Sequence, residues 1–206
     1  MIVNPVVFSA IRDAIPNASL LLWRRGRWEP INRIISGGDR TIYCHAGTVE
    51  VDDAGSVWSL EMLQWKGGLR YPLWRYVQDY PGRMDVFFPN AGGRFSYKPD
   101  LAVAEMRKLI SRPYGYGNIL HVGLSYVPLV RLLVTPSLDD EANGYCAPHC
   151  SMARVIADTA GGVDPVCNTP AYATTPGDLA RSLFFRYLYT LYFTTEQVVK
   201  CIKRMQ

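Results

Sequence analysis

The pattern of hydrophobic and polar positions predicts a β-hairpin near residue 50. Residues 41–51 are rich in β-branched and aromatic side chains, which favours a strand, and the run ends at the turn sequence Asp52-Asp-Ala-Gly55. Residues 56–63 form a second segment of the same kind. Because a short turn joins the two segments, we expect them to pair as antiparallel strands. A further strand is expected at residues 84–88.

Helical patterns follow in the second half of the chain. Residues 99–110 are expected to form a helix, and Thr194-Thr-Glu-Gln197 matches a capping box that would begin a terminal helix ending near Arg204. Another helix is expected from Pro148, because proline suits the first helical position. One face of this helix carries small side chains that would allow close packing against a sheet, namely Cys150, Ala153 and Ala157.

The order of these elements indicates an α+β fold in which an antiparallel sheet packs against helices. The chain has 206 residues, of which 49% are hydrophobic and 19% charged, an ordinary globular composition. It contains no internal repeat or low-complexity tract. We therefore expect a single domain over residues 1–206, with loops at 136–144 and 161–175 that could frame a cleft.

The composition also narrows the classes of partner and location. Residues 119–134 form the most hydrophobic stretch, but they are too few to cross a bilayer, so no integral membrane segment is expected. Residues 1–16 lack the basic start of a signal peptide, which favours a cytoplasmic location. The net charge of +4 is mild and its basic residues fit a solvated turn and a helix end, so no nucleic-acid partner is expected.

Cys150 is the principal candidate for chemistry. It lies in the first turn of the predicted helix, where unpaired backbone N–H groups and the helix dipole favour an anion. A thiol in that setting ionises more easily, and the thiolate is the nucleophilic form. The structural alternative is a buried, inert thiol, since free cysteine is among the most buried residue types. A base close to the thiol would decide between the two.

The chain contains three histidines that could act as this base. His149 is the neighbour of Cys150 in the helix, so the two side chains point in different directions. His121 lies in an apolar stretch without a nearby carboxylate and is interpreted as a packing residue. His45 lies on the strand 41–51, which holds a side chain at one angle, and we predict that it is the general base.

A catalytic histidine also needs a partner for its second ring nitrogen. Glu61 lies on the neighbouring predicted strand, within cross-strand reach of His45. The alternative for Glu61 is a solvated strand carboxylate, and the pattern alone favours neither. Glu50 lies five residues along the strand from His45 and therefore falls on its opposite face.

A zinc site is the main rival for the cysteines and histidines. Cys44, His45, Cys146, His149 and Cys150 are the available ligand types. However, Cys44 and His45 are strand neighbours that point to opposite faces, and no C-x-x-C occurs in the chain. We therefore predict no metal site and no cofactor. Five cysteines, an odd number, indicate reduced thiols rather than a disulfide framework.

Six short motifs occur in a recognisable order between about residues 16 and 185. They are Ser19-Leu-Leu-Leu-Trp23, Tyr43-Cys-His-Ala-Gly47, Val57-Trp-Ser-Leu-Glu61, Tyr71-Pro-Leu73, Cys150-Ser-Met-Ala153 and Thr175-Pro-Gly-Asp-Leu179. This order resembles the circularly permuted branch of the NlpC/P60 papain-like superfamily, the YiiX-like hydrolases, in which the histidine strand precedes the cysteine helix. The chain departs from the family pattern at Cys44, usually serine, and at Met152, usually glutamate. The second departure bears on substrate specificity.

The resemblance implies a permuted papain-like fold with Cys150 as nucleophile, His45 as base and Glu61 as the residue that orients the histidine. The oxyanion would be bound by the Cys150 backbone N–H and one further donor. Tyr43, two residues before His45 and so on the same strand face, is one candidate for that donor. Tyr116 is the other.

The implied function is that of a cysteine hydrolase that cleaves an amide bond in a cell-wall peptide or a related peptide, in a cytoplasmic, phage or mobile-element setting. A lipid acyltransferase or esterase on the same fold is an alternative, and residues 119–134 would then face the substrate. A catalytically inactive binding module is a second alternative.

Overall fold

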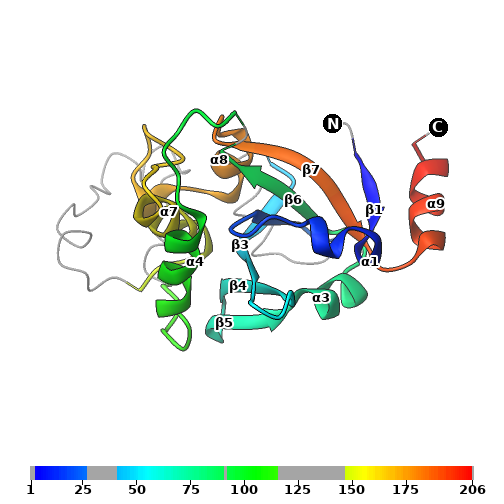
Figure 1. The fold of residues 1–206 in the computed structure, drawn as a ribbon, viewed down its shortest axis with the longest axis horizontal. Coiled ribbons are helices and arrows are strands. Elements are labelled where there is room, and N and C mark those ends of the chain that lie inside the picture. The colour runs from blue at the N-terminus through cyan, green and yellow to red at the C-terminus, as the bar shows by residue number, and fades with distance from the viewer. Residues whose placement is uncertain (1–2, 27–40, 91, 116–146, 206) are drawn as a thin grey trace, which may run out of the picture.

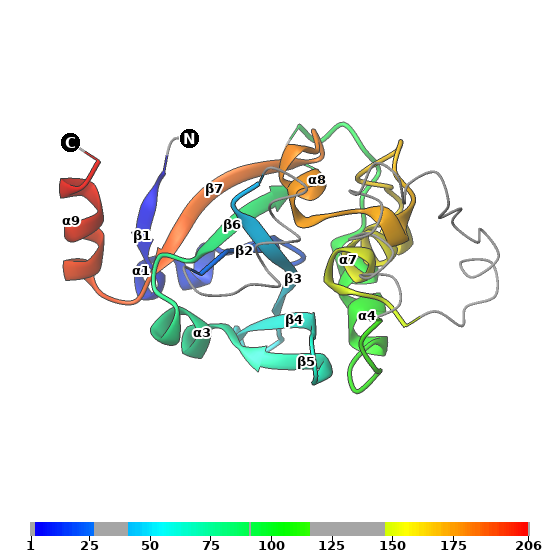
Figure 2. The same ribbon diagram turned by 180° about the vertical axis from the view of Figure 1, so that it is seen from behind.

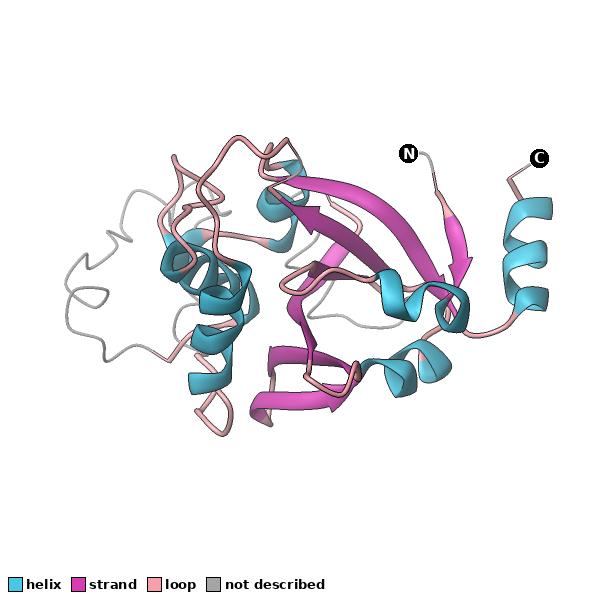
Figure 3. Ribbon diagram, viewed as in Figure 1, coloured by secondary structure: helices cyan, strands magenta, loops and turns pink. Residues whose placement is uncertain are grey.

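A sheet of seven strands runs through the described part of the chain (Figures 1 and 3). The computed structural model describes residues 3–26, 41–90, 92–115 and 147–205. The strand order is β1-β7-β6-β2-β3-β4-β5, and neighbours are antiparallel except β1 and β7, which are parallel. The strands are β1 (Pro5–Val7), β2 (Leu20–Arg24), β3 (Tyr43–Val51), β4 (Val57–Leu63), β5 (Gly67–Pro72), β6 (Met84–Pro89) and β7 (Phe185–Tyr192). The expected α+β class is confirmed, although the sheet is not purely antiparallel.

Helices cover both faces of this sheet (Figures 1 and 2). They are α1 (Phe8–Ile11), α3 (Leu73–Asp79), α4 (Pro99–Lys108), α7 (Cys150–Ala160), α8 (Pro176–Arg181) and α9 (Thr195–Lys203), with 3₁₀ turns η1 (Arg12–Ala14) and η3 (Ala171–Ala173). Helix α9 contacts β1 and β7, at the far end of the molecule from α4 and α7. Among the described helices, none combines the length and the apolar character needed to cross a bilayer.

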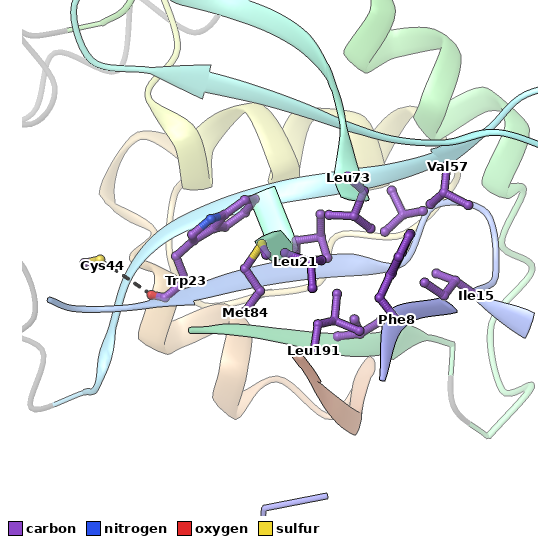
Figure 4. Packing of buried hydrophobic residues seen from close by; sticks show 12 residues of the cluster. Phe8, Ile15, Leu21, Trp23, Cys44, Val57, Leu73, Met84 and Leu191 are labelled. Carbon is purple, nitrogen blue, oxygen red and sulfur yellow. Dashed lines mark hydrogen bonds between the residues drawn. The ribbon is translucent and has the colours of Figure 1, made fainter. Parts of the chain in front are cut away.

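The core on the face covered by α1 and α3 consists of aliphatic and aromatic side chains (Figure 4). Phe8 of α1 and Leu73 of α3 pack with Leu21, Met84 and Leu191 from three adjacent strands. Removing such surface from water contributes about 25 cal/mol per Å² of apolar area. This cluster therefore holds the centre of the sheet rigid beside the site described below.

The other face of the sheet is covered by α4, α7 and α8. Ala153 and Ala157 of α7 belong to the same buried cluster as Leu60 and Met62 of β4. The small side chains predicted on one face of this helix are thus all buried, including Cys150. Their size lets α7 lie close to β3 and β4, both of which it contacts.

The predicted hairpin forms as expected. Strands β3 and β4 pair from Gly47 opposite Glu61 to Val51 opposite Val57. Asp52 closes the turn, because its side chain accepts hydrogen bonds from the N–H groups of residues 54 and 56 at 3.1 and 2.8 Å.

Other predicted elements are also confirmed with small shifts. Helix α4 begins at Pro99 and ends at Lys108, two residues before the expected end. Helix α9 begins after Thr194, whose side chain forms the predicted capping box with Gln197. The strand expected at 84–88 extends to Pro89 as β6.

Strands β5 and β7 are among those that the sequence pattern does not predict. Strand β5 begins with Gly67 and Gly68, and glycine is depleted in strands. In β7, aliphatic and aromatic side chains occupy both alternating sets of positions, which hides the period of two. Each of these two segments is held in an extended conformation by hydrogen bonds to a neighbouring strand, β4 for β5 and β6 for β7.

Candidate active site

Helix α7 begins at Cys150, and His149 is its N-cap residue. The His149 Nδ1 accepts a hydrogen bond from the Met152 N–H at 3.4 Å, and its Nε2 donates to the Tyr172 carbonyl at 2.9 Å. The helix therefore starts two residues later than the proline rule indicates, with Pro148 just outside it. Both ring nitrogens of His149 have backbone partners, and the imidazole also interacts with the side chain of its neighbour Cys150.

His45 and Glu61 are brought together across β3 and β4. The His45 Nε2 and the Glu61 Oε2 are 2.7 Å apart. Glu61 lies opposite Gly47, two residues from His45 on the same face of β3. The ring of Trp23, directly opposite His45 on β2, packs edge-on against the imidazole with centroids 4.9 Å apart. The ring orientation is thus fixed from two sides.

Burial decides between the two interpretations of Glu61. Its side chain is 1% exposed, so it is not a solvated strand carboxylate. The Tyr76 hydroxyl of α3 lies beside it, and burial together with the charge of Glu61 raises the pKa of Tyr76. Within the described residues, Glu61 Oε1 makes no hydrogen bond of normal geometry. The His45 side chain is 16% exposed, which leaves the imidazole accessible.

The sheet opens where these residues lie. Strands β3 and β4 stop pairing beyond Gly47 and Glu61, after which β3 continues along β2 and β4 continues along β5. Figures 1 and 2 show β4 and β5 turned away from β2, β6 and β7. The first residue of α7, Cys150, interacts with His45 at this opening. Since Nε2 of His45 faces Glu61, Nδ1 is the ring nitrogen left for the thiol.

The electrostatics of the pair favour ionisation of both groups. Burial by itself would lower the pKa of His45, but Cys150 and Glu61 outweigh it and raise that pKa to about 10. Burial likewise opposes ionisation of Cys150, but the charge of His45 and hydrogen bonds from His149 and His45 hold the pKa of the thiol well below its usual range. A thiolate–imidazolium pair is therefore the expected state at neutral pH.

Tyr43 does not lie on the face that simple alternation predicts. Trp23 and Arg24 are consecutive on β2, but they lie opposite His45 and Tyr43, so Cys44 is an extra residue in β3. This β-bulge turns Tyr43 to the face opposite His45. The Tyr43 hydroxyl donates to Asp85 Oδ2 at 2.7 Å in a buried network. Tyr43 is thus excluded as an oxyanion donor, and Tyr116 lies outside the described residues.

Tyr114, two residues before Tyr116, lies beside the Cys150 thiol. Its hydroxyl donates to the Cys150 side chain and accepts from the Cys150 backbone N–H and from Gln64. Burial, followed by the charge of Cys150, raises the pKa of Tyr114, so the hydroxyl keeps its proton. The motif Pro113-Tyr-Gly-Tyr-Gly117 could have identified it, but the spacing does not tell which tyrosine faces the thiol.

Gly115 explains how Tyr114 reaches the thiol. The Gly115 N–H donates to the Pro148 carbonyl at 3.1 Å. A Cβ atom at Gly115 would lie 1.8 Å from the Ala147 carbonyl oxygen, so only glycine allows this approach. The contact brings the segment after α4 against the start of α7.

A cavity of about 280 Å³ opens beside the site. Its lining includes His45, Glu61, Gln64, Tyr76 and Tyr114. Cavities of this size with a few convergent polar groups are typical of small-molecule or side-chain binding sites. The cavity gives a substrate a route to the imidazole and to the hydroxyl that contacts Cys150.

Comparisons with known proteins identify a shared fold. No protein-family model and no curated protein matches the chain. The structure is similar to the crystal structure of metalloprotein yiiX from Escherichia coli O157:H7 (DUF1105), with a TM-score of 0.58. The alignment covers 86% of this chain and 98% of that chain, at 10% sequence identity. At this identity the likeness is one of fold, and the chain has a YiiX-like α+β fold.

Proposed function

We propose that this protein is a cysteine hydrolase that cleaves an amide bond, with a circularly permuted papain-like arrangement of Cys150, His45 and Glu61. One observation carries the proposal: a thiol at the start of a helix interacts with an imidazole whose other nitrogen lies 2.7 Å from a buried carboxylate. This spatial order of nucleophile, base and orienting group is the general arrangement of enzymes that catalyse covalent acyl transfer.

The residues support a two-step reaction. The Cys150 thiolate attacks the carbonyl carbon, and the carbonyl electron pair moves to oxygen. When the intermediate collapses, the C–N bond breaks and the His45 imidazolium gives its proton to the leaving amine. His45 then takes a proton from water, whose oxygen attacks the thioester. The acid leaves and the thiolate–imidazolium pair is restored.

Tyr114 and the Cys150 backbone N–H are the proposed oxyanion donors. The Tyr114 hydroxyl and the Cys150 N–H contact each other beside the thiol, so a substrate oxygen that binds there would replace their interaction. Gln64, which donates to the Tyr114 hydroxyl, would hold that hydroxyl in place.

A metal centre is not part of the proposal, although yiiX is described as a metalloprotein. Among residues 3–26, 41–90, 92–115 and 147–205, no three His, Cys, Asp or Glu side chains converge on a common point. At the site itself, His45 Nε2 and Glu61 Oε2 face each other, so neither of these two atoms is free to bind a metal ion. The described residues therefore do not supply a donor set for a metal ion.

Thiol labelling tests the proposal without a known substrate. At pH 6 to 7, iodoacetamide should alkylate Cys150 roughly tenfold or more faster than an ordinary thiol, because far more of it is thiolate. In His45→Ala the imidazolium no longer lowers the pKa of Cys150, so the variant should lose this rate advantage at pH 6. Its alkylation rate should rise again at higher pH, where the thiol ionises without the histidine. Mass spectrometry would compare Cys150 with the other four cysteines of the chain, Cys44, Cys146, Cys167 and Cys201. Slow labelling that is equal at all five would contradict the proposal.

A screen of muropeptides against fatty-acyl esters would identify the bond that is cleaved. The resemblance to NlpC/P60 hydrolases favours a cell-wall or related peptide amide. Turnover of esters alone would instead support the acyltransferase or esterase alternative. Turnover should fall as the pH passes about 10, because the His45 imidazolium that protonates the leaving group is lost there.

Glu61→Gln should lower kcat by roughly one to four orders of magnitude, because the tautomer of His45 is no longer set by a carboxylate. Glu61 is buried, so the variant should also lose stability, contrary to the small effect expected of a solvated carboxylate. Glu50→Gln is the matched control. Glu50 is equally buried, lies on the opposite face of β3 and pairs with Arg70 and Arg107. The Glu50→Gln variant should lose stability, but its kcat should stay unchanged once it is corrected for the fraction of folded protein. An equal loss of rate in both variants would mean that Glu61 acts only through folding.

Tyr114→Phe separates oxyanion binding from thiol activation. Removal of one oxyanion donor typically costs roughly 10²- to 10³-fold in kcat. Alkylation of Cys150 by iodoacetamide forms no oxyanion, so its rate should stay within about threefold of the wild-type rate. If turnover survives in the variant, or if both rates fall together, Tyr114 is not an oxyanion donor.

A further inference from the structure

A second cavity adjoins the one beside His45. It has a volume of about 440 Å³ and lies between the β4–β5 turn and the segment after α4. Lys66 and Tyr114 line both cavities, so the second begins where the first ends. Tyr114 also contacts the Cys150 thiol, so the second cavity begins one side chain away from the proposed nucleophile.

The walls of the second cavity are held in a fixed relation. The Gly68 N–H donates to the Arg112 carbonyl, and the Ser111 N–H donates to the Gly68 carbonyl, both at 2.9 Å. A Cβ atom at Gly67, whose φ is +73°, would lie 2.1 Å from the Arg112 carbonyl oxygen. The turn therefore packs backbone to backbone against the segment after α4, and the cavity between them does not depend on flexible side chains.

Two residues in these walls adopt a costly backbone conformation. Trp65 and Ser111 have φ values of 69° and 66°, in the left-handed region that side-chain-bearing residues rarely occupy. Such residues cost about 1–3 kcal/mol each and concentrate at ligand-binding sites. Trp65 is also 84% exposed, so burial of its indole does not offset this cost. An exposed, rigidly presented indole is suited to pack on a ligand.

The charge of the second cavity is positive. Lys66 and Arg112 line it, and in the part of the chain that the structure describes no carboxylate lies within 4 Å of either cation. None of the residues that line it is acidic. In the first cavity the acidic lining residue is Glu61, whose charge is taken up by His45. A ligand that spans both cavities would therefore meet positive charge beyond Tyr114 that no carboxylate of the described residues neutralises.

We propose that the second cavity is a substrate subsite that binds a carboxylate, with Lys66 and Arg112 as its cationic partners and Trp65 as an apolar platform. The inference rests on the proposed hydrolase function and specifies its substrate as an acidic peptide, with a carboxylate a few bonds from the amide that is cleaved. Two cations on separate segments suit a carboxylate, whose two oxygens can each accept a charge-assisted hydrogen bond.

Matched alkylating peptides test this subsite through Cys150. The probes are N-bromoacetyl-glycine, -diglycine and -triglycine, each as the free acid and as the carboxamide, which places the carboxylate at three distances from the reactive carbon. The ratio of acid to carboxamide alkylation rates at Cys150 is compared with the same ratio for 2-mercaptoethanol. At one or more lengths we expect the protein to favour the acid by roughly 1.5- to 5-fold for each cation. The preference should shrink in 0.5 M salt.

Substitutions assign the preference to the two cations. Lys66→Met and Arg112→Met should each lower the ratio, the double variant should match 2-mercaptoethanol, and Lys66→Glu combined with Arg112→Met should reverse the preference. Lys203→Met in α9, at the opposite end of the molecule (Figure 1), makes the same change in net charge and should leave the ratio unchanged. Trp65→Gly keeps the backbone conformation and should slow acid and carboxamide alike for bromoacetyl-Gly-Phe, without a change in their ratio.

The outcomes distinguish the subsite from the hydrolase. Fast, selective alkylation of Cys150 with no acid preference at any length, or a preference that survives in the double variant, would overturn the subsite and leave the hydrolase proposal intact. Failure of every probe to select Cys150 over the other thiols would overturn both.

Discussion

Cys150→Ala and His45→Ala should each abolish amide turnover, and the double variant should be no worse than either single variant. The thiolate and the imidazolium depend on each other, because the charge of His45 lowers the pKa of Cys150 and Cys150 raises that of His45. Groups that act as one unit lose their whole effect when either is removed, roughly 10⁶-fold in kcat for comparable triads. The measurement is kcat for the substrate that the screen identifies, at pH 7.

Cys44→Ala is the control for this prediction. Cys44 is the bulge residue next to His45, and its thiol donates to the Trp23 carbonyl at 3.5 Å rather than to a reacting group. Its removal should leave kcat within a few-fold of the wild-type value. If the losses for Cys150→Ala and His45→Ala instead multiply in the double variant, the two residues do not cooperate and the proposed mechanism is wrong.

Asp158→Ala should lower the free energy of unfolding by about 3–5 kcal/mol, because it leaves the buried guanidinium of Arg154 without a counter-charge. Arg154 is fully buried in α7, and its Nε and Nη2 each lie 2.8 Å from an Asp158 oxygen. The same guanidinium donates to the Ala18 carbonyl at 2.9 Å and to Thr48 Oγ1 at 3.0 Å, so it ties the cysteine helix to the sheet. Urea unfolding would measure the loss.

Glu105→Ala provides the comparison for an exposed ion pair. Glu105 pairs with Lys108 on the surface of α4, where the Lys108 side chain is 69% exposed, and should contribute at most about 1 kcal/mol. Combining Asp158→Ala with Arg154→Met should restore part of the lost stability, since no unpaired charge remains. A loss below about 1 kcal/mol for Asp158→Ala alone would show that Arg154 is satisfied by its carbonyl and hydroxyl partners.

Local sequence was sufficient for the elements that carry the candidate site. The hairpin of β3 and β4 follows from β-branched runs around the turn Asp52-Asp-Ala-Gly55, and its register places Glu61 within reach of His45. The small residues after Pro148 indicate a helix that packs closely on a sheet, and Cys150 lies at its start. These inferences succeed because turn chemistry, side-chain periodicity and helix capping act over a few residues.

Tertiary structure determined the features that local sequence rules do not indicate. The bulge at Cys44 moves Tyr43 away from His45, and nothing within the strand sequence signals it, because β2 imposes it through pairing. The contact of Gly115 with the Ala147–Pro148 backbone holds the neighbouring Tyr114 beside the thiol. Burial of Glu61, which excludes a solvated carboxylate, depends on α3 and β5.

The sequence by itself therefore determined which residues could do chemistry and which secondary structures hold them. It did so because the propensities of those segments agree with their final environment. Only the packed structure determined which face each side chain occupies at an irregularity, and how far the pKa values of Cys150 and His45 move. Faces and pKa values depend on neighbours that are distant along the chain, and the burial and charges that those neighbours supply exist only once the chain has folded.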